Sequence, residues 1–317
     1  MRIVFMGTPK FAVPTLAMLV ESYQVVGVFT QPDKPAGRGQ HLTAAPVKEW
    51  AQERGLLILQ PRTLRDAAVQ AQLAELKPNM IVVAAFGVLL PKPVLDLPPH
   101  GCINVHASLL PKYRGAAPIP AAILNGESEV GITLIRMDEG LDTGPMIAQA
   151  SVPIRPDDTT DTLTVRLAEL GAQSLAETLP RWVAGQITPQ PQDHSRATLA
   201  PKLNKLDGRL DWPKPAAELD RRVRAFSPWP GTFTSWNGKL LRIISVQVTG
   251  RPPEKAWEQA AQGTAGLVVK DGGAIGVVTG DGVLRLVEVQ LEGKRAMSAL
   301  DFVRGQPTLV CSVLGAG

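Results

Sequence analysis

The sequence predicts a doubly wound α/β domain followed by a small β-barrel domain. Strand and helix signals alternate through the first half, which is typical of a mostly parallel, Rossmann-like sheet covered by helices. A polar, Pro-rich stretch without periodicity follows. Several short strands then fill the last third, which favours an OB-like barrel. We expect a sheet domain over residues 1–188, a linker over 189–206 and a barrel domain over 207–317.

The first half alternates between the two kinds of element. Asn79–Phe86 is a nearly continuous apolar run, as expected for a strand buried on both faces. Together the predicted strands are Arg2–Met6, Gln24–Phe29, Leu56–Gln60, Asn79–Phe86, Gly101–Ala107 and Gly131–Met137. The predicted helices are Lys10–Val20, Ala45–Arg54, Arg65–Leu76, Ala117–Asn125 and Thr162–Ala184. Ligands are expected at the carboxyl ends of such strands.

After the linker, Ala216–Ala225 predicts a short helix. Turns such as Asn237-Gly238 then separate strand-like runs. These runs are Thr232–Trp236, Leu240–Val248, Gly266–Val269, Ala274–Thr279 and Val283–Gln290.

Composition excludes several classes of protein. The chain has 317 residues, 44% of them hydrophobic, and no run of 18 apolar residues that would predict a membrane span. A strand begins within the first residues, so we expect no leader peptide and a cytoplasmic protein. Cys102 and Cys311 fit no metal-ligand spacing, and both are predicted to be buried, reduced thiols.

Positive charge is concentrated in the C-terminal third. Residues 1–199 carry 17 Lys/Arg against 18 Asp/Glu, a net charge of −1, whereas residues 200–317 carry 16 against 11, a net charge of +5. The two values agree with the total of +4. This asymmetry favours a module that faces a polyanion, although a basic surface without function is the simpler alternative.

The first strand-to-helix turn, Met6-Gly7-Thr8-Pro9, lacks the glycines that let a dinucleotide pyrophosphate approach the backbone. The sheet is therefore not predicted to bind NAD(P). Asp142-Thr143-Gly144 matches the triplet of aspartic proteases, but that chemistry needs a second carboxylate in a matching motif, and the sequence has none.

Asn104 and His106 form the strongest candidate site. They are two residues apart on a predicted strand, so both side chains leave the same face just before a loop. A carboxylate, Asp142, follows the next strand. An amide and an imidazole beside an acid can stabilise a negative oxygen and move protons, which indicates chemistry at a carbonyl. The competing interpretations are a structural histidine and a turn-forming aspartate.

Two further segments are candidates for binding. The run Phe86–Leu90 offers an apolar slot with bare backbone at Gly87, suited to a flat heteroaromatic ring, or it is ordinary core. The loop Gln31–Gln40 carries Lys34 and Arg38 among Pro and Gly, and it either grips a substrate or is a solvated surface loop.

Taken together, these motifs resemble the methionyl-tRNA formyltransferases, a family of 10-formyltetrahydrofolate-dependent formyltransferases. The resemblance runs nearly end to end and leaves no catalytic position different. It covers Val4–Pro9, Gln31–Gly39, Asn104–Pro111, Arg114–Pro118, Met137–Gly144, Arg224–Gly231 and Gly293–Met297.

The resemblance implies formyl transfer from 10-formyltetrahydrofolate to the α-amino group of methionine on initiator tRNA. Such a transfer requires no metal and the sequence offers no cluster of metal ligands, so we expect none, and we expect a monomer. The resemblance also implies Asn104, His106 and Asp142 as catalytic residues. The folate site would comprise Phe86, Gly87, Val88, Leu89, Leu90, Ser108, Leu109, Leu110, Pro111, Asp138 and Gly140. The tRNA would be held by Lys34, Arg38, Lys202 and Lys205.

Three alternatives share parts of this pattern. A sugar-nucleotide N-formyltransferase would share the first domain but not the basic loop and C-terminal third. A folate hydrolase that releases formate would need no tRNA surface. A non-enzymatic RNA-binding OB protein would bind tRNA without turnover.

Overall fold

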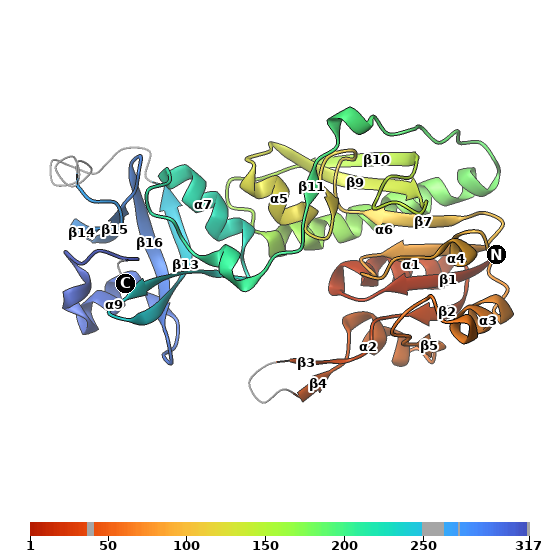
Figure 1. The fold of residues 1–317 in the computed structure, drawn as a ribbon, viewed down its shortest axis with the longest axis horizontal. Helices are drawn as coiled ribbons and strands as arrows, with labels where there is room; N and C mark the ends of the chain where they lie inside the picture. The colour runs from red at the N-terminus through yellow and green to blue at the C-terminus, as the bar shows by residue number, and fades with distance from the viewer. Residues whose placement is uncertain (37–40, 249–262, 272, 316–317) are drawn as a thin grey trace. The chain divides into compact units, whose positions relative to one another are not determined.

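The computed structural model describes residues 1–36, 41–248, 263–271 and 273–315 (Figure 1). The chain divides into two compact units. The first contains residues 1–119, 128–154 and 162–201, and the second contains residues 120–127, 155–161 and 202–317. The domain bounds drawn from the sequence stay a prediction, and the structure adds that residues 189–201 of the expected linker group with the first unit.

The first unit is built on a seven-stranded sheet with the order β10-β9-β7-β6-β1-β2-β5. Its strands are β1 (Arg2–Gly7), β2 (Gln24–Phe29), β5 (Ile58–Leu59), β6 (Met80–Ala84), β7 (Cys102–His106), β9 (Glu129–Arg136) and β10 (Met146–Pro153). From β5 to β7 all neighbours are parallel, which confirms the predicted mostly parallel, Rossmann-like sheet. The chain leaves β1 for β2 on one side and returns to β6 on the other. The topological switch point of the sheet therefore lies between the neighbouring strands β1 and β6.

Helices alternate with these strands as the sequence predicts. They are α1 (Val13–Ser22), α2 (Pro46–Gln52), α3 (Ala67–Glu75), α4 (Lys92–Leu95), α5 (Pro118–Leu124) and α6 (Thr160–Val183). Helix α6 approaches the sheet closely at Gly171, where a Cβ would lie 2.8 Å from Val105 and 3.6 Å from Ile132. The glycine therefore lets the helix backbone cover β7 and β9.

Strand β9 runs antiparallel to β7, with Ile103 opposite Arg136 and His106 opposite Thr133. Strand β10, which the sequence analysis did not predict, is antiparallel to β9 and forms the edge of the sheet. The loop that carries Asp142 therefore connects two antiparallel strands. Asp142 follows the next strand, as expected, but that strand runs antiparallel to β7.

The second unit is an OB-like domain, as predicted, around an antiparallel sheet of order β12-β13-β16-β15-β14, in which β17 also pairs with β16. Its elements are α7 (Ala216–Ala225), β12 (Thr232–Trp236), β13 (Lys239–Val248), β14 (Val268–Asp271), β15 (Ala274–Val278), β16 (Val283–Leu291), β17 (Met297–Ser298) and α9 (Ala299–Gly305). A buried cluster that includes Leu219, Leu241 and Phe302 joins α7, the sheet and α9.

Short elements complete the description. They are β3 (Lys34–Ala36), β4 (His41–Thr43), β8 (Arg114–Gly115), β11 (Leu199–Ala200), and the 3-10 helices η1 (Lys10–Ala12), η2 (His194–Arg196), η3 (Lys205–Gly208) and η4 (Pro307–Leu309). Strands β3 and β4 pair antiparallel, so the end of the described part of the Gln31–Gln40 loop pairs with the residues that follow the loop.

The two cysteines differ in their surroundings. Cys102 is buried on β7, and burial raises the pKa of its thiol to about 12. Cys311 is exposed and has a φ of 66°, so the prediction of two buried thiols is wrong for this residue, which lies in a turn after η4. In the part of the chain that the structure describes, no helix has both the length and the apolar composition that a membrane crossing requires.

Candidate functional site

Strand β7 presents the two polar residues of the candidate site on one face. Ile103 and Val105 alternate with them and are buried in the core, Val105 beneath α6. Asn104 and His106 consequently point to the opposite face, where they remain 9% and 6% exposed. Burial excludes most bulk water from these groups while leaving them an opening, which is the environment that strengthens electrostatic interactions in a reaction.

Asp142 reaches these residues from the loop between β9 and β10. Its Oδ1 accepts a hydrogen bond from Asn104 Nδ2 over 3.2 Å, and its Oδ2 accepts one from the Gly115 backbone N–H over 2.9 Å. The same Oδ2 lies 3.6 Å from His106 Nδ1. The structure therefore brings together all three side chains that the sequence singled out for catalysis.

The Asp142 loop is held in a demanding backbone conformation. Asp142 itself has a φ of 52°, in the left-handed region that non-glycine residues seldom adopt. A Cβ at Gly144 would lie 1.9 Å from the Arg136 carbonyl oxygen, so only glycine fits there. This loop places the carboxylate at the cost of local strain, as is common at functional sites.

The tautomer of His106 follows from its partner. His106 Nε2 lies 3.0 Å from the Tyr113 carbonyl oxygen, and a carbonyl can only accept, so Nε2 carries a proton. Nδ1 is the ring nitrogen that faces Asp142. In the neutral ring, Nδ1 has a free lone pair and can accept a hydrogen bond. In the charged ring, Nδ1 carries a proton and can donate a hydrogen bond.

The predicted folate residues of the Ser108–Pro111 loop are largely internal. Ser108 is fully buried and donates to the Lys112 carbonyl over 2.7 Å, while Leu110 is 3% exposed. Thr133 on β9 holds this loop, because its Oγ1 donates to the Ser108 carbonyl and accepts from the Leu110 N–H. Leu109 lies against Gly131, and Pro111 follows a cis peptide bond and is half-buried. The sequence analysis missed Thr133, whose polarity in an apolar strand was the available signal.

The predicted Phe86–Leu90 slot follows β6 at the switch point. The side chains of Phe86 and Leu90 are buried in the core, whereas Gly87 and Leu89 are exposed and Val88 is half-buried. This segment therefore offers backbone and the Leu89 side chain to a ligand.

Two residues near the switch point were given no individual role by the sequence analysis, although Gln31 begins the candidate loop Gln31–Gln40. Gln31, two residues after the end of β2, donates from Nε2 to the Phe86 carbonyl over 2.8 Å. Thr8, directly after β1, donates to the same oxygen over 3.3 Å. Their place close after the carboxyl ends of β1 and β2 was the available signal for both residues.

Asp138 and Gly140 form the exposed turn before Asp142. Asp138 Oδ1 accepts from the Gly140 N–H over 3.1 Å and from Thr143 Oγ1 over 2.7 Å. Gly140 is tightly packed, since a Cβ there would lie 1.9 Å from Thr143 Oγ1. In this structure both residues shape the loop.

The residues predicted to hold tRNA belong to both units. Lys202 and Lys205 are exposed residues of the second unit. Lys34 lies on β3 of the first unit, and Arg38 lies outside the described residues.

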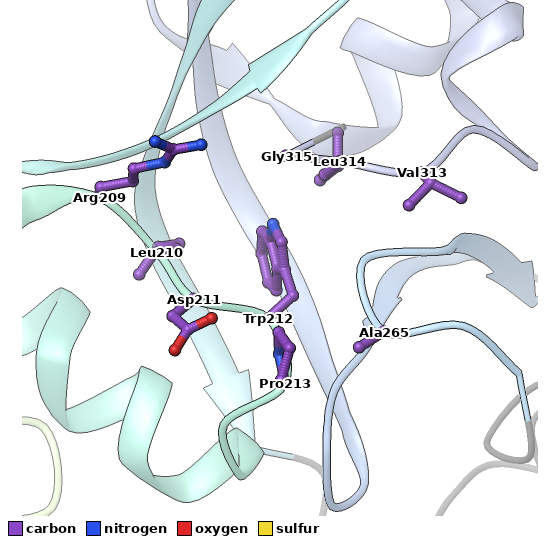
Figure 2. Close-up of a pocket in the computed structure, with 9 residues that line it drawn as sticks. All are labelled: Arg209, Leu210, Asp211, Trp212, Pro213, Ala265, Val313, Leu314 and Gly315. Carbon is purple, nitrogen blue, oxygen red and sulfur yellow. The ribbon is translucent and has the colours of Figure 1, made fainter. Parts of the chain in front are cut away.

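A cavity of about 460 Å³ lies in the second unit (Figure 2). Arg209 and Asp211 are its charged residues, while Trp212 is buried and donates to Thr234 Oγ1 over 3.1 Å. Its lining comprises Arg209, Leu210, Asp211, Trp212, Pro213, Ala265, Val313, Leu314 and Gly315. The geometry favours the β7 group over this cavity as the reactive site, because only the former joins an acid, an imidazole and an amide. Across the described residues, no three His, Cys, Asp or Glu side chains are grouped as metal ligands.

Known proteins match both units. The family model described as "Formyl transferase" matches residues 1–179, and "Formyl transferase, C-terminal domain" matches residues 202–307. A methionyl-tRNA formyltransferase of Myxococcus xanthus is 50% identical over 96% of this chain and 95% of its own length. One from Roseiflexus sp. is 47% identical over 96% of this chain and 92% of its own.

Solved structures share the fold at low identity. An N-formyltransferase from Helicobacter canadensis, in complex with folinic acid and dTDP-3-aminofucose, has a TM-score of 0.66 and 20% identity, covering 90% of this chain and 97% of its own. The sugar 3N-formyl transferase WlaRD has a TM-score of 0.67 and 19% identity, covering 93% and 99%. The matches in both units and the identity over nearly the whole length lead to one conclusion: the chain belongs to the formyl transferase family, and within it to the methionyl-tRNA formyltransferases.

Proposed function

We propose that the chain transfers the formyl group of 10-formyltetrahydrofolate to the α-amino group of methionyl-initiator tRNA. The observation that carries the proposal is the Asn104–Asp142–His106 group at the carboxyl end of β7, in a chain whose curated relatives at 47–50% identity are methionyl-tRNA formyltransferases. The sugar-nucleotide enzymes share only the fold, at 19–20% identity. The high identity therefore favours the tRNA substrate over an amino sugar nucleotide.

In this reaction the neutral amine attacks the formyl carbon, and a new C–N bond forms as the carbonyl oxygen becomes negative. The C–N10 bond then breaks, the amine nitrogen loses one proton and N10 gains one. Asp142 is the acceptor for the amine proton, directly or through water. Its carboxylate already accepts two hydrogen bonds, which hold it in place for that role.

Two donors are available for the negative oxygen. Asn104 uses one N–H of its amide on Asp142, and the second N–H can donate to the formyl oxygen. Because Nε2 of His106 serves Tyr113, its Nδ1 is the nitrogen that acts in the reaction. The charged ring can donate from Nδ1 to the oxygen and then to the departing N10. A donor of this kind lowers the barrier by about 3 kcal/mol.

The folate ring is proposed to lie in the crevice beside the Phe86–Leu90 segment. The exposed backbone at Gly87 and the exposed side chain of Leu89 support this placement, since a flat heterocycle binds through main-chain groups and an apolar face. The Ser108–Pro111 loop, with Asp138 and Gly140, completes the predicted folate site. Of these residues, fully buried Ser108 can act only by shaping the loop.

The tRNA is proposed to contact the basic C-terminal third, which carries a net charge of +5. Lys202 and Lys205 are exposed there and available to phosphates. Lys34 and Arg38 of the Gln31–Gln40 loop are proposed to reach the acceptor stem. Such contacts should make binding fall steeply with salt. The protein is proposed to act as a monomer in the cytoplasm, without a metal.

The deciding experiment is a formylation assay with charged initiator tRNA and 10-formyltetrahydrofolate, with an amino sugar nucleotide as the competing acceptor. Formyl transfer to the tRNA supports the proposal, and transfer to the sugar alone refutes it. Formate release without any acceptor would instead identify a hydrolase. His106→Ala should lower turnover about a hundredfold or more, whereas tRNA binding without turnover in the unaltered protein would indicate an RNA-binding protein.

A second assay tests the loop. Arg38→Ala should lower the tRNA-dependent rate while folate affinity stays unchanged, because the residue is assigned to the acceptor stem. Equal losses in both measurements would contradict the assignment.

A further inference from the structure

The segment 190–200, which the sequence marks as linker, is hydrogen-bonded to both loops that form the site. We call it the site strap. Gln190 and Met146 exchange two backbone hydrogen bonds of 2.8 Å, which tie the strap to the start of β10. At its other end β11 pairs in parallel with β8, and the Ala200 carbonyl accepts from the Ala116 N–H over 2.9 Å. The strap thus joins the loop that carries Asp142 to the loop that follows His106.

Gln192 is the side chain at the centre of the strap. It is 5% exposed, and its amide makes four hydrogen bonds. Oε1 accepts from Arg114 Nε over 3.1 Å and from the other guanidinium nitrogen over 2.7 Å. Nε2 donates to the Asp142 carbonyl over 2.8 Å and to the Gly144 carbonyl over 2.7 Å.

These bonds use both acceptor positions and both donor positions of the amide. The amide can therefore adopt one orientation only, because a flipped amide would point N–H groups at a guanidinium and its oxygen at two carbonyls. Arg114 is in turn 7% exposed and also contacts His194 Nδ1 over 3.2 Å. A buried, fully bonded amide of this kind is a rigid connection between the two loops.

The connection ends on the residue that the reaction needs. Gln192 binds the backbone of Asp142, which has an unfavourable φ of 52°, and Arg114 precedes Gly115, whose N–H binds the Asp142 carboxylate. The backbone of Asp142 is thus bonded to Gln192 directly, and its carboxylate is bonded to the residue that follows the Gln192 partner Arg114. Without these bonds the strained loop is free to relax to a commoner conformation.

We propose that Gln192 is a positioning residue that holds Asp142 against Asn104 and His106 in the catalytically competent arrangement. The inference rests on the proposed function for its kinetic test. A shift of about 1 Å in a catalytic group can lower a rate about a hundredfold, so loss of the Gln192 donors should lower kcat by about 10- to 100-fold. The KM for the folate should change less than about twofold, because the Gln192 bonds go to Arg114 and to the backbone of Asp142 and Gly144, and the Asp138–Gly140 turn is held by its own hydrogen bonds.

The informative variant is Gln192→Glu, which keeps a partner for Arg114 but removes both N–H donors to the Asp142 loop. Gln190→Ala is the matched control, since the exposed Gln190 side chain donates to the nearby Thr188 carbonyl and to no other residue in the described part of the chain. We expect a 10- to 100-fold fall in kcat for the first and an unchanged kcat for the second. An unchanged kcat in Gln192→Glu overturns the proposal.

A double-mutant cycle separates positioning from general destabilisation. If Gln192 acts through Asp142, then adding Gln192→Glu to an Asp142→Ala variant should lower kcat by no more than about twofold. A cost as large as in the unaltered background would mean that the residue acts through the fold as a whole, and this would overturn the assignment.

Hydrogen exchange at the Gly115 amide reports the position of Asp142 without requiring catalytic turnover, because this amide donates to Asp142 Oδ2. Gln192→Glu should raise hydrogen exchange at this amide about tenfold or more, while the Ala116 amide, bonded to Ala200, stays protected. Unchanged exchange at Gly115 overturns the positioning role. If the unaltered protein forms no formyl-methionyl-tRNA, the proposed function fails, yet this exchange result still tests the placement of Asp142.

Discussion

Thr133 and Thr15 are both fully buried threonines of the first unit, but their hydroxyls differ in bonding. Thr133 Oγ1 donates to the Ser108 carbonyl and accepts from the Leu110 N–H and from Gln149 Nε2. Thr15 Oγ1 has no hydrogen-bond partner among the described residues. Threonine-to-valine is nearly isosteric, so the same substitution at the two sites compares a bonded hydroxyl with an unbonded one.

The expected changes in the free energy of unfolding have opposite signs. Thr133→Val leaves two buried backbone groups without partners, each at about 1–3 kcal/mol, so we expect a loss of about 2–6 kcal/mol. The exposed Gln149 amide can bond water and adds little. Thr15→Val removes an unpaired buried hydroxyl and should raise the free energy of unfolding by about 1 kcal/mol.

The assay is urea unfolding followed by hydrogen exchange of peptides from the first unit, so that the transition of the second unit does not enter the measurement. Catalytic turnover should fall in Thr133→Val, because the Ser108–Pro111 loop loses its anchor, and should persist in Thr15→Val. A loss below about 0.5 kcal/mol in Thr133→Val would refute the hydrogen-bond argument. An equal change at both sites would refute it as well.

Three further outcomes are expected. Asn104→Ala should lower turnover about a hundredfold while folate affinity, measured by calorimetry, is retained; a near-normal rate would remove the residue from the reaction. One thiol per folded chain, Cys311, should react with a disulfide reagent, and Cys102 should react only after unfolding, because burial raises its pKa to about 12. The hydrogen bond from Lys48 lowers the pKa of the Asp33 carboxyl in the folded protein. The stability that this bond contributes is therefore present above the carboxyl pKa of the unfolded chain, about 3.9, and is lost as the pH falls through the lower pKa of the folded state. The stability difference between Asp33→Asn and the unaltered protein should therefore narrow on acidification, as urea midpoints at about pH 6 and about pH 2.5 can test.

The elements that the sequence predicts well are those whose pattern is decided locally. Helix α7 and strand β12 begin and end where the periodicity predicts, because Leu219 and Val223 recur at helical spacing and Thr232 to Trp236 alternates buried with half-buried positions. Strand β10 was missed because it lies at the sheet edge, where all of its residues except Ile147 are half-buried or exposed. Helix α9 was also missed, because it has only seven residues. The Ser298 side chain that accepts from the Asp301 N–H was a capping signal that could have indicated it.

The features of the candidate site likewise divide into those that local sequence determines and those that depend on how the strands pair. That Asn104 and His106 share a face follows from strand geometry alone, and the structure shows it. The direction of β9 does not follow from sequence, since its buried run from Val130 to Ile135 is equally compatible with parallel and antiparallel pairing. For this reason the chemistry of Asp142 could be expected while the loop that delivers it could not.

Gln192 shows why a polar, aperiodic stretch is a poor guide to the absence of structure. The composition around it indicates a linker, yet this side chain is 5% exposed and its partners lie 48 to 78 residues away in the sequence. A buried amide is costly unless each of its groups is bonded, so it persists only where distant backbone and a distant guanidinium are already arranged to receive it. No local pattern records that arrangement. The strap can be recognised only once the two loops it joins are in place, and the same dependence makes Gln192 informative about the position of Asp142.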